Sequence, residues 1–171
     1  LCRLYFDEVI NDGANNYQLI KKAKTTGAKK ILIDAHMDEV GMLVSDVLDG
    51  GFLRVTNVGG IDCKILQPCE VTIHAKEDIY GVVSATPPHL MSKKELPNFD
   101  GLFIDTGFKK EELEEKGVRV GTPISFKYHL TELLNDRICG KGFDDKICIC
   151  AGIEVVKQLK DTDCEIILQL S

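Results

Sequence analysis

A short apolar run that ends in a histidine and two acidic residues constrains the fold of this chain more than any other feature. Residues 31–33 are Ile-Leu-Ile, without the alternation of a half-exposed strand, and therefore predict a strand buried on both faces of a parallel α/β sheet. His36, Asp38 and Glu39 follow almost directly. Open α/β sheets form their ligand crevices at the carboxyl ends of strands. The sequence thus predicts an α/β fold with polar chemistry at this strand end.

The middle of the chain, residues 40–126, has a different sequence pattern. Short β-prone runs alternate with glycines, which is typical of a small β-barrel or sandwich. The predicted strands are residues 41–44, 51–55, 70–74, 80–83, 102–104 and 118–120. Two segments interrupt them. One is a loop from Pro87 to Gly101, and the other is a charged stretch, residues 109–116, which predicts a short exposed helix ending at Gly117.

The last part of the chain again has the sequence pattern of an α/β domain. Asp144 precedes an apolar stretch at residues 147–159, which predicts a helix buried on much of its surface. Cys148 and Cys150 point to different faces of such a helix and are expected to be small core fillers. Residues 164–170 predict another core strand.

These shifts predict an interrupted domain. Residues 1–39 and residues 127–171 are expected to form the two parts of one α/β domain, with an inserted β-barrel at residues 40–126. Acidic and histidine side chains then stand on both sides of the insertion.

Composition and charge exclude several classes of protein. The net charge of −6 argues against a broad phosphate-binding face, so nucleic acid is not expected as a partner. No apolar run approaches the roughly 18 residues of a membrane span, so we expect no membrane partner and a cytoplasmic location. The seven cysteines contain no Cys-x-x-Cys pair and are expected to be reduced thiols.

His36 and Asp38 are candidate site residues because residues two apart on a strand point the same way, whereas Glu39 faces the other side. Asp38 would either orient the imidazole of His36 or bind a metal directly. The alternative is a surface turn without function, because a His-x-Asp triplet is weak evidence by itself.

Asp144 and Asp145 also allow two interpretations. Acidic residues at the start of a helix cap exposed backbone N–H groups. Alternatively, one carboxylate bridges two divalent ions about 3.5–4 Å apart, a geometry that activates water.

Six motifs in a fixed order carry a more specific signal. They are Ala35-His-Met-Asp-Glu-Val-Gly41, Val58-Gly-Gly60, Gly81-Val-Val83 with Pro87-Pro-His-Leu90, Leu102-Phe-Ile-Asp-Thr-Gly107, Gly117-Val-Arg-Val-Gly121 and Gly142-Phe-Asp-Asp-Lys146. In this order they resemble the M42 family of metallo-aminopeptidases, of the glutamyl and tetrahedral aminopeptidase type. The resemblance covers nearly the whole chain.

The resemblance implies a zinc-peptidase-like α/β catalytic domain interrupted by a β-barrel domain. It implies two divalent metal ions, expected to be zinc with cobalt and manganese as alternatives. His36 matches a metal ligand, Asp38 the catalytic acid that orients the site, and Asp144 the carboxylate that bridges both ions, followed in the family by a peptide bond that is often cis. Peptides with free N-termini are the implied substrates, and large tetrahedral homo-oligomers assembled through the β-domain are the implied assembly. The Pro87-Pro88-His89 motif of the inserted domain receives no catalytic role.

This sequence also departs from the family pattern. Lys146 stands where the family usually has arginine, and Gly142 where a larger residue is usual. The family's general base, the first of two consecutive glutamates, would follow the strand at residues 164–170 and lie beyond Ser171 with further ligands. We therefore expect this chain to be the N-terminal part of an aminopeptidase and to be inactive alone, since a catalytic zinc normally takes three protein ligands.

Two rival functions stay open. Some relatives of the family are labelled endoglucanase or cellulase, but a glycosidase needs two carboxyl groups across a cleft that is usually lined with aromatic side chains. This chain has no Trp and only 6% aromatic residues, and the adjacent Asp38 and Glu39 would point apart. The second rival is a non-catalytic remnant whose β-domain serves as an assembly module.

Overall fold

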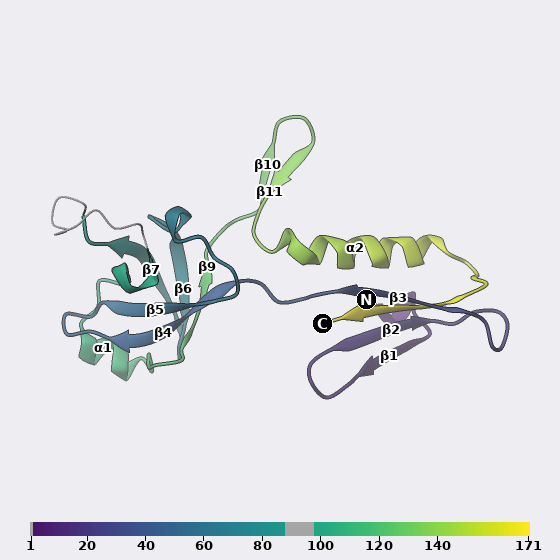
Figure 1. The fold of residues 1–171 in the computed structure, drawn as a ribbon, viewed down its shortest axis with the longest axis horizontal. Coiled ribbons are helices and arrows are strands. Elements are labelled where there is room, and N and C mark those ends of the chain that lie inside the picture. The colour runs from purple at the N-terminus through teal and green to yellow at the C-terminus, as the bar shows by residue number, and fades with distance from the viewer. Residues whose placement is uncertain (1, 88–97) are drawn as a thin grey trace. The chain divides into compact units, whose positions relative to one another are not determined.

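The computed structural model describes residues 2–87 and 98–171 (Figure 1). These residues form two compact units. Leu1–Glu39 and Gly140–Ser171 make up the first, called the α/β unit below, and Val40–Cys139 makes up the second, called the barrel unit. The boundary after the insertion differs from the one expected at residue 126, because residues 127–139 group with the barrel unit.

The α/β unit contains a four-stranded sheet, in the order β1-β2-β12-β3, and one long helix (Figure 1). The central strand β12 pairs antiparallel with β2 and parallel with β3. The elements are the 3-10 helix η1 (Cys2–Leu4), β1 (Glu8–Asn11), β2 (Tyr17–Lys21), β3 (Lys30–Ala35), α2 (Phe143–Gln158) and β12 (Glu165–Leu170). The mixed α/β fold and the strand expected at residues 164–170 are therefore present.

The strand expected at residues 31–33 is present as β3, but the prediction that both its faces are buried is wrong. Ile31, Leu32 and Ile33 are 47%, 60% and 37% exposed. Among the described residues β3 pairs only with β12, so it lies at an edge of the sheet rather than inside it. Leu168 of β12, which is fully buried, occupies the core position instead.

The burial expected for the helix at residues 147–159 is also wrong. Helix α2 covers one face of the sheet and buries only Gly152 and Val156 (Figure 1). Ile147 is exposed, and so are Cys148 and Cys150, which therefore are not core fillers. A Cβ atom on Gly152 would lie 2.9 Å from Leu168 Cδ1, so glycine permits the close approach of helix and sheet.

The barrel unit contains a closed barrel of strands in the order β4-β5-β8-β7-β6-β9. Its elements are β4 (Gly41–Val47), β5 (Leu53–Val58), η2 (Cys63–Ile65), β6 (Glu70–His74), β7 (Asp78–Ala85), η4 (Phe99–Gly101), β8 (Leu102–Asp105), α1 (Lys110–Glu115), β9 (Pro123–Phe126) and the hairpin β10 (Thr131–Leu133) and β11 (Arg137–Cys139). Of the Pro87-Pro88-His89 motif, only Pro87 lies within the described residues.

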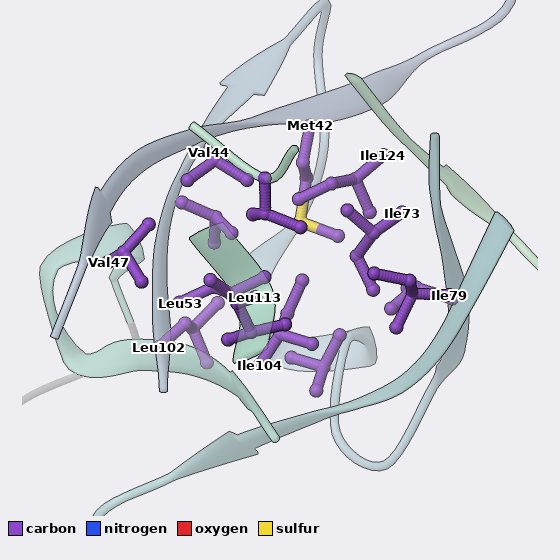
Figure 2. Close-up of a cluster of buried hydrophobic side chains, with 14 of the residues drawn as sticks. Met42, Val44, Val47, Leu53, Ile73, Ile79, Leu102, Ile104, Leu113 and Ile124 are labelled. Atoms are coloured by element: carbon purple, nitrogen blue, oxygen red, sulfur yellow. The ribbon is translucent and has the colours of Figure 1, made fainter. Parts of the chain in front are cut away.

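The interior of the barrel is filled by aliphatic side chains that point towards one another from different strands (Figure 2). Leu53 and Ile104 are fully buried there, and Leu113 of the short helix α1 closes the same cluster. Burial of a Leu or Ile side chain stabilises a fold by about 1.5–3 kcal/mol, so this cluster is the main source of stability in the barrel unit.

The strand expected at residues 118–120 is wrong, and the barrel closes with β9 instead. The amide of Val118 donates to the carbonyl of Leu113 at 2.9 Å, which ends helix α1 rather than joining a sheet. Gly121 then turns the chain with a φ of +87°. Pro123 is tolerated as the first residue of β9, where a strand can lack one donor.

The charged stretch at residues 109–116 forms the expected short helix, and Gly117 follows it with a φ of +85°. None of the helices in the described part of the chain is long and apolar enough to cross a membrane.

Candidate metal centre

The candidate site begins where β3 ends. Ala35, the last residue of the strand, is buried, and residues 36–40 follow outside regular structure. The amide of Met37 donates to the carbonyl of Ser171 at 2.6 Å, and the amide of Ser171 donates to the carbonyl of Ala35 at 3.1 Å. Main-chain hydrogen bonds therefore hold the segment that carries His36 against the end of β12.

The imidazole of His36 lies between two carboxylates. Its Nδ1 atom is 3.0 Å from Oδ1 of Asp38, and its Nε2 atom is 3.2 Å from Oδ1 of Asp144. Nδ1 also lies 3.2 Å from the carbonyl oxygen of Asp38. The structure thus brings together the three residues singled out from the sequence, although 108 positions separate His36 from Asp144.

The imidazole of His36 has a carboxylate oxygen at each of its two nitrogens. A neutral ring carries only one N–H, so it donates to one carboxylate and turns a lone pair towards the other, unless the ring is protonated or a metal ion takes the place of a proton. Desolvation disfavours protonation of His36, but hydrogen bonds to Asp38 and Asp144 and the charges of both carboxylates raise its pKa above the ordinary value. The two carboxylates therefore favour a positive charge at the imidazole.

Asp144 and Asp145 have different neighbours. Asp144 faces His36, whereas a hydrogen bond to Asp145 raises the pKa of the Cys148 thiol. Asp144 and Asp145 have non-helical backbone angles at a kink inside α2, and the hydrogen-bond partner of the Asp144 carboxylate in the described residues is His36 rather than a backbone N–H group. The peptide bond between Asp144 and Asp145 is cis, as the resemblance implied.

The geometry fits two ligands of one divalent ion. Zinc bonds of about 2.0–2.2 Å at a tetrahedral angle place two ligand atoms about 3.4 Å apart, close to the separation of Nε2 and Oδ1. Asp38 lies at the opposite ring nitrogen and cannot share that ion, but it can fix the tautomer of His36. Within residues 2–87 and 98–171, no group of three or more His, Cys, Asp or Glu side chains is arranged to hold a metal. His36 and Asp144 alone offer one possible ion fewer ligands than the three protein ligands that a catalytic zinc normally takes.

A second histidine, His74, lies in a polar row on the barrel unit. Its Nδ1 atom is 2.9 Å from Oδ1 of Asp78, and its Nε2 atom is 2.8 Å from Oγ of Ser125. This order of side chains matches that of a nucleophilic serine site. However, the three residues lie on neighbouring strands β7, β6 and β9, where polar cross-strand contacts stabilise a sheet. We assign this row no catalytic role.

Sequence reasoning missed one group beside the site. Glu39 contacts Lys141 and Lys146, although it was expected only to face away from Asp38. No signal in the sequence linked Glu39 to these two lysines, which stand more than 100 positions away.

The sequence profile of the M42 glutamyl aminopeptidases matches residues 16–171, which include every residue of the candidate site. The chain belongs to the M42 peptidase family. One relative is the lysyl aminopeptidase of Pyrococcus furiosus, which is 33% identical to this chain over 150 residues. That match covers 84% of this chain but 43% of the relative, so the chain spans less than half the length of this M42 protein.

Solved M42 structures agree with the fold. An aminopeptidase from the archaeon Desulfurococcus kamchatkensis superposes with a TM-score of 0.90 at 33% identity, over 99% of this chain and 47% of that one. The TET1 peptidase of Pyrococcus horikoshii, which assembles into a tetrahedron or a large octahedral shell, gives a TM-score of 0.79 at 32% identity, over 96% of this chain and 50% of that one. This chain is therefore similar to about half of each structure.

Proposed function

We propose that the protein containing this chain is a metal-dependent aminopeptidase that hydrolyses N-terminal residues of peptides through a water activated by two metal ions. The observation that carries this proposal is the convergence of His36 and Asp144, whose Nε2 and Oδ1 atoms lie 3.2 Å apart although the residues are distant in the chain. Membership of the M42 family supports the choice of a metal ion over a proton in the active protein.

Each site residue has a distinct role in this proposal. His36 would hold a metal ion through Nε2, Asp38 would hold the opposite ring nitrogen and fix the tautomer, and Asp144 would be the carboxylate shared by the two ions. When bound, the two ions lower the pKa of a shared water and polarise the scissile carbonyl. We place the remaining ligands and the general base in the part of the relatives' length that this chain does not match, and therefore expect this chain alone to be inactive.

Peptides are a better substrate class than glucans for this site. Asp38 and Asp144 address the two nitrogens of one imidazole, whereas the acid and base of a glycosidase stand across a sugar-binding cleft. The relative from Pyrococcus furiosus is also described as an aminopeptidase. We include zinc as the metal, a cytoplasmic location and self-assembly through the barrel unit in the proposal, the last because the TET1 peptidase forms closed shells.

The test is peptide hydrolysis by a longer protein, which contains this chain and the part that corresponds to the unmatched half of its relatives. We expect release of the N-terminal residue from a short peptide with a free amine, and no release from the same peptide after N-acetylation. A zinc chelator should abolish the release and added zinc should restore it. The proposal fails if the chelated protein keeps its activity, or if reducing sugar from soluble cellulose is the only product detected.

A further inference from the structure

Glu39 stands at the point where the chain leaves the α/β unit. It is the last residue of that unit before Val40–Cys139, and Lys141 is among the first residues after the chain returns. The Nζ atom of Lys141 lies 2.8 Å from Oε1 of Glu39. This ion pair therefore joins the two segments that lead into and out of the barrel unit.

The same carboxylate reaches helix α2. Oε2 of Glu39 lies 3.3 Å from Nζ of Lys146, so each oxygen has its own lysine. The side chain of Glu39 is only 25% exposed, and the hydrogen bond from Lys141, followed by the charges of both lysines, lowers its pKa. A charged, partly desolvated carboxylate with two partners is held more firmly than an exposed ion pair.

Gly142 makes room for this arrangement. A Cβ atom at that position would lie 2.7 Å from Oε2 of Glu39 and 3.1 Å from Nζ of Lys146. Its φ of +71° is also one that side chains other than glycine rarely adopt. The glycine at this position is therefore matched to the contact between Glu39 and Lys146.

The two lysines enclose the residue that faces His36. Asp144 lies between Lys141 and Lys146 in the chain, and His36 lies three positions before Glu39. We propose that Glu39 is a positioning residue that clamps residues 141–146 to the end of β3, and thereby keeps the Asp144 carboxylate opposite Nε2 of His36. The role in metal binding rests on the proposed function, whereas the clamp itself does not.

Glu39→Gln tests the clamp because it keeps the size of the side chain and removes the charge. Glu165→Gln is the matched control, since Glu165 is 22% exposed and pairs with Lys30 at 2.6 Å, at the opposite end of β3 from His36. Amide hydrogen exchange of the metal-free chain should speed up about tenfold at residues 140–146 in Glu39→Gln and not in Glu165→Gln. Zinc affinity, followed through the ring signals of His36, should fall about tenfold in Glu39→Gln alone.

Substitutions at the lysine separate positioning from general stability. Lys146→Met should reproduce the faster exchange and the weaker zinc binding, while Lys146→Arg should retain slow exchange because the guanidinium keeps the ion pair. The clamp is overturned if exchange at residues 140–146 in Glu39→Gln matches that in Glu165→Gln. If the unmodified chain takes up no zinc, the metal-binding role fails, and the exchange measurement still decides the clamp.

Discussion

Replacing Asp144 by alanine should lower the zinc affinity of this chain by at least about 100-fold, whereas replacing Asp145 should leave it almost unchanged. Asp144 supplies one of the two donor atoms that meet at 3.2 Å, and its loss leaves His36 as the only ligand at that point in the described residues. Asp145 is the neighbouring residue with the same charge, and it interacts with Cys148 instead.

The measurement is a zinc titration at constant pH, followed by the NMR signals of the His36 ring. Both variants remove one negative charge beside the site, so a purely electrostatic attraction of zinc would weaken binding equally in both. Equal losses would therefore contradict the assignment of Asp144 as a ligand. Circular dichroism of the two variants provides the control for folding.

Replacing Gly51 by alanine should destabilise the barrel unit by about 3 kcal/mol or more, whereas Gly50→Ala should cost only about 1 kcal/mol. Both residues have positive φ angles, +86° for Gly51 and +96° for Gly50, so both variants carry the conformational strain. Only Gly51 also carries a clash, because its Cβ atom would lie 1.9 Å from the carbonyl oxygen of Phe108. A Cβ atom on Gly50 would have the ring of Phe52 as its nearest neighbour, at 3.9 Å.

The free energy of unfolding of the barrel unit can be measured by amide exchange of its strands at increasing urea, which separates it from the α/β unit. A difference of about 2 kcal/mol between the two variants would confirm the close approach of the turn and the segment at Phe108. Similar costs for Gly50→Ala and Gly51→Ala would show that backbone conformation alone matters there.

Local pattern was sufficient to predict most elements of the fold. Three elements are encoded within a few residues each and are present in the structure: the strand with the Ile-Leu-Ile run, the strand at residues 164–170, and the charged helix before Gly117. Burial could not be predicted in the same way. The exposure of Leu32 depends on whether another strand pairs with β3, and that contact is not encoded in the run itself.

The error at residues 118–120 has a local physical origin. Val118-Arg-Val120 has the alternation of a strand, but it lies between glycines that turn the chain, so local hydrogen bonds replaced sheet pairing.

Only part of the candidate site could be predicted from the sequence. His36 and Asp38 follow a recognisable strand, while Asp144 could not be distinguished from a helix cap by sequence pattern alone. The family resemblance singled out Asp144, and the contact with Nε2 of His36 gave it a physical reason. The two lysines that hold Glu39 required coordinates, because nothing in their spacing relates them to residue 39.

The parallel pairing of β3 with β12 has a consequence for how the chain folds. Ile31 is matched with Ile166, so this ladder closes a loop that contains the entire barrel unit. The hairpin pairings inside the barrel, such as Gly41 with Val58, join residues that are much nearer in sequence, and the widest barrel pairing, Met42 with Ile124, still spans a shorter stretch of chain. Contacts between distant residues are slow to form. On the ribosome, the barrel can therefore fold before β12 has been synthesised, while β3 still lacks the strand with which it pairs.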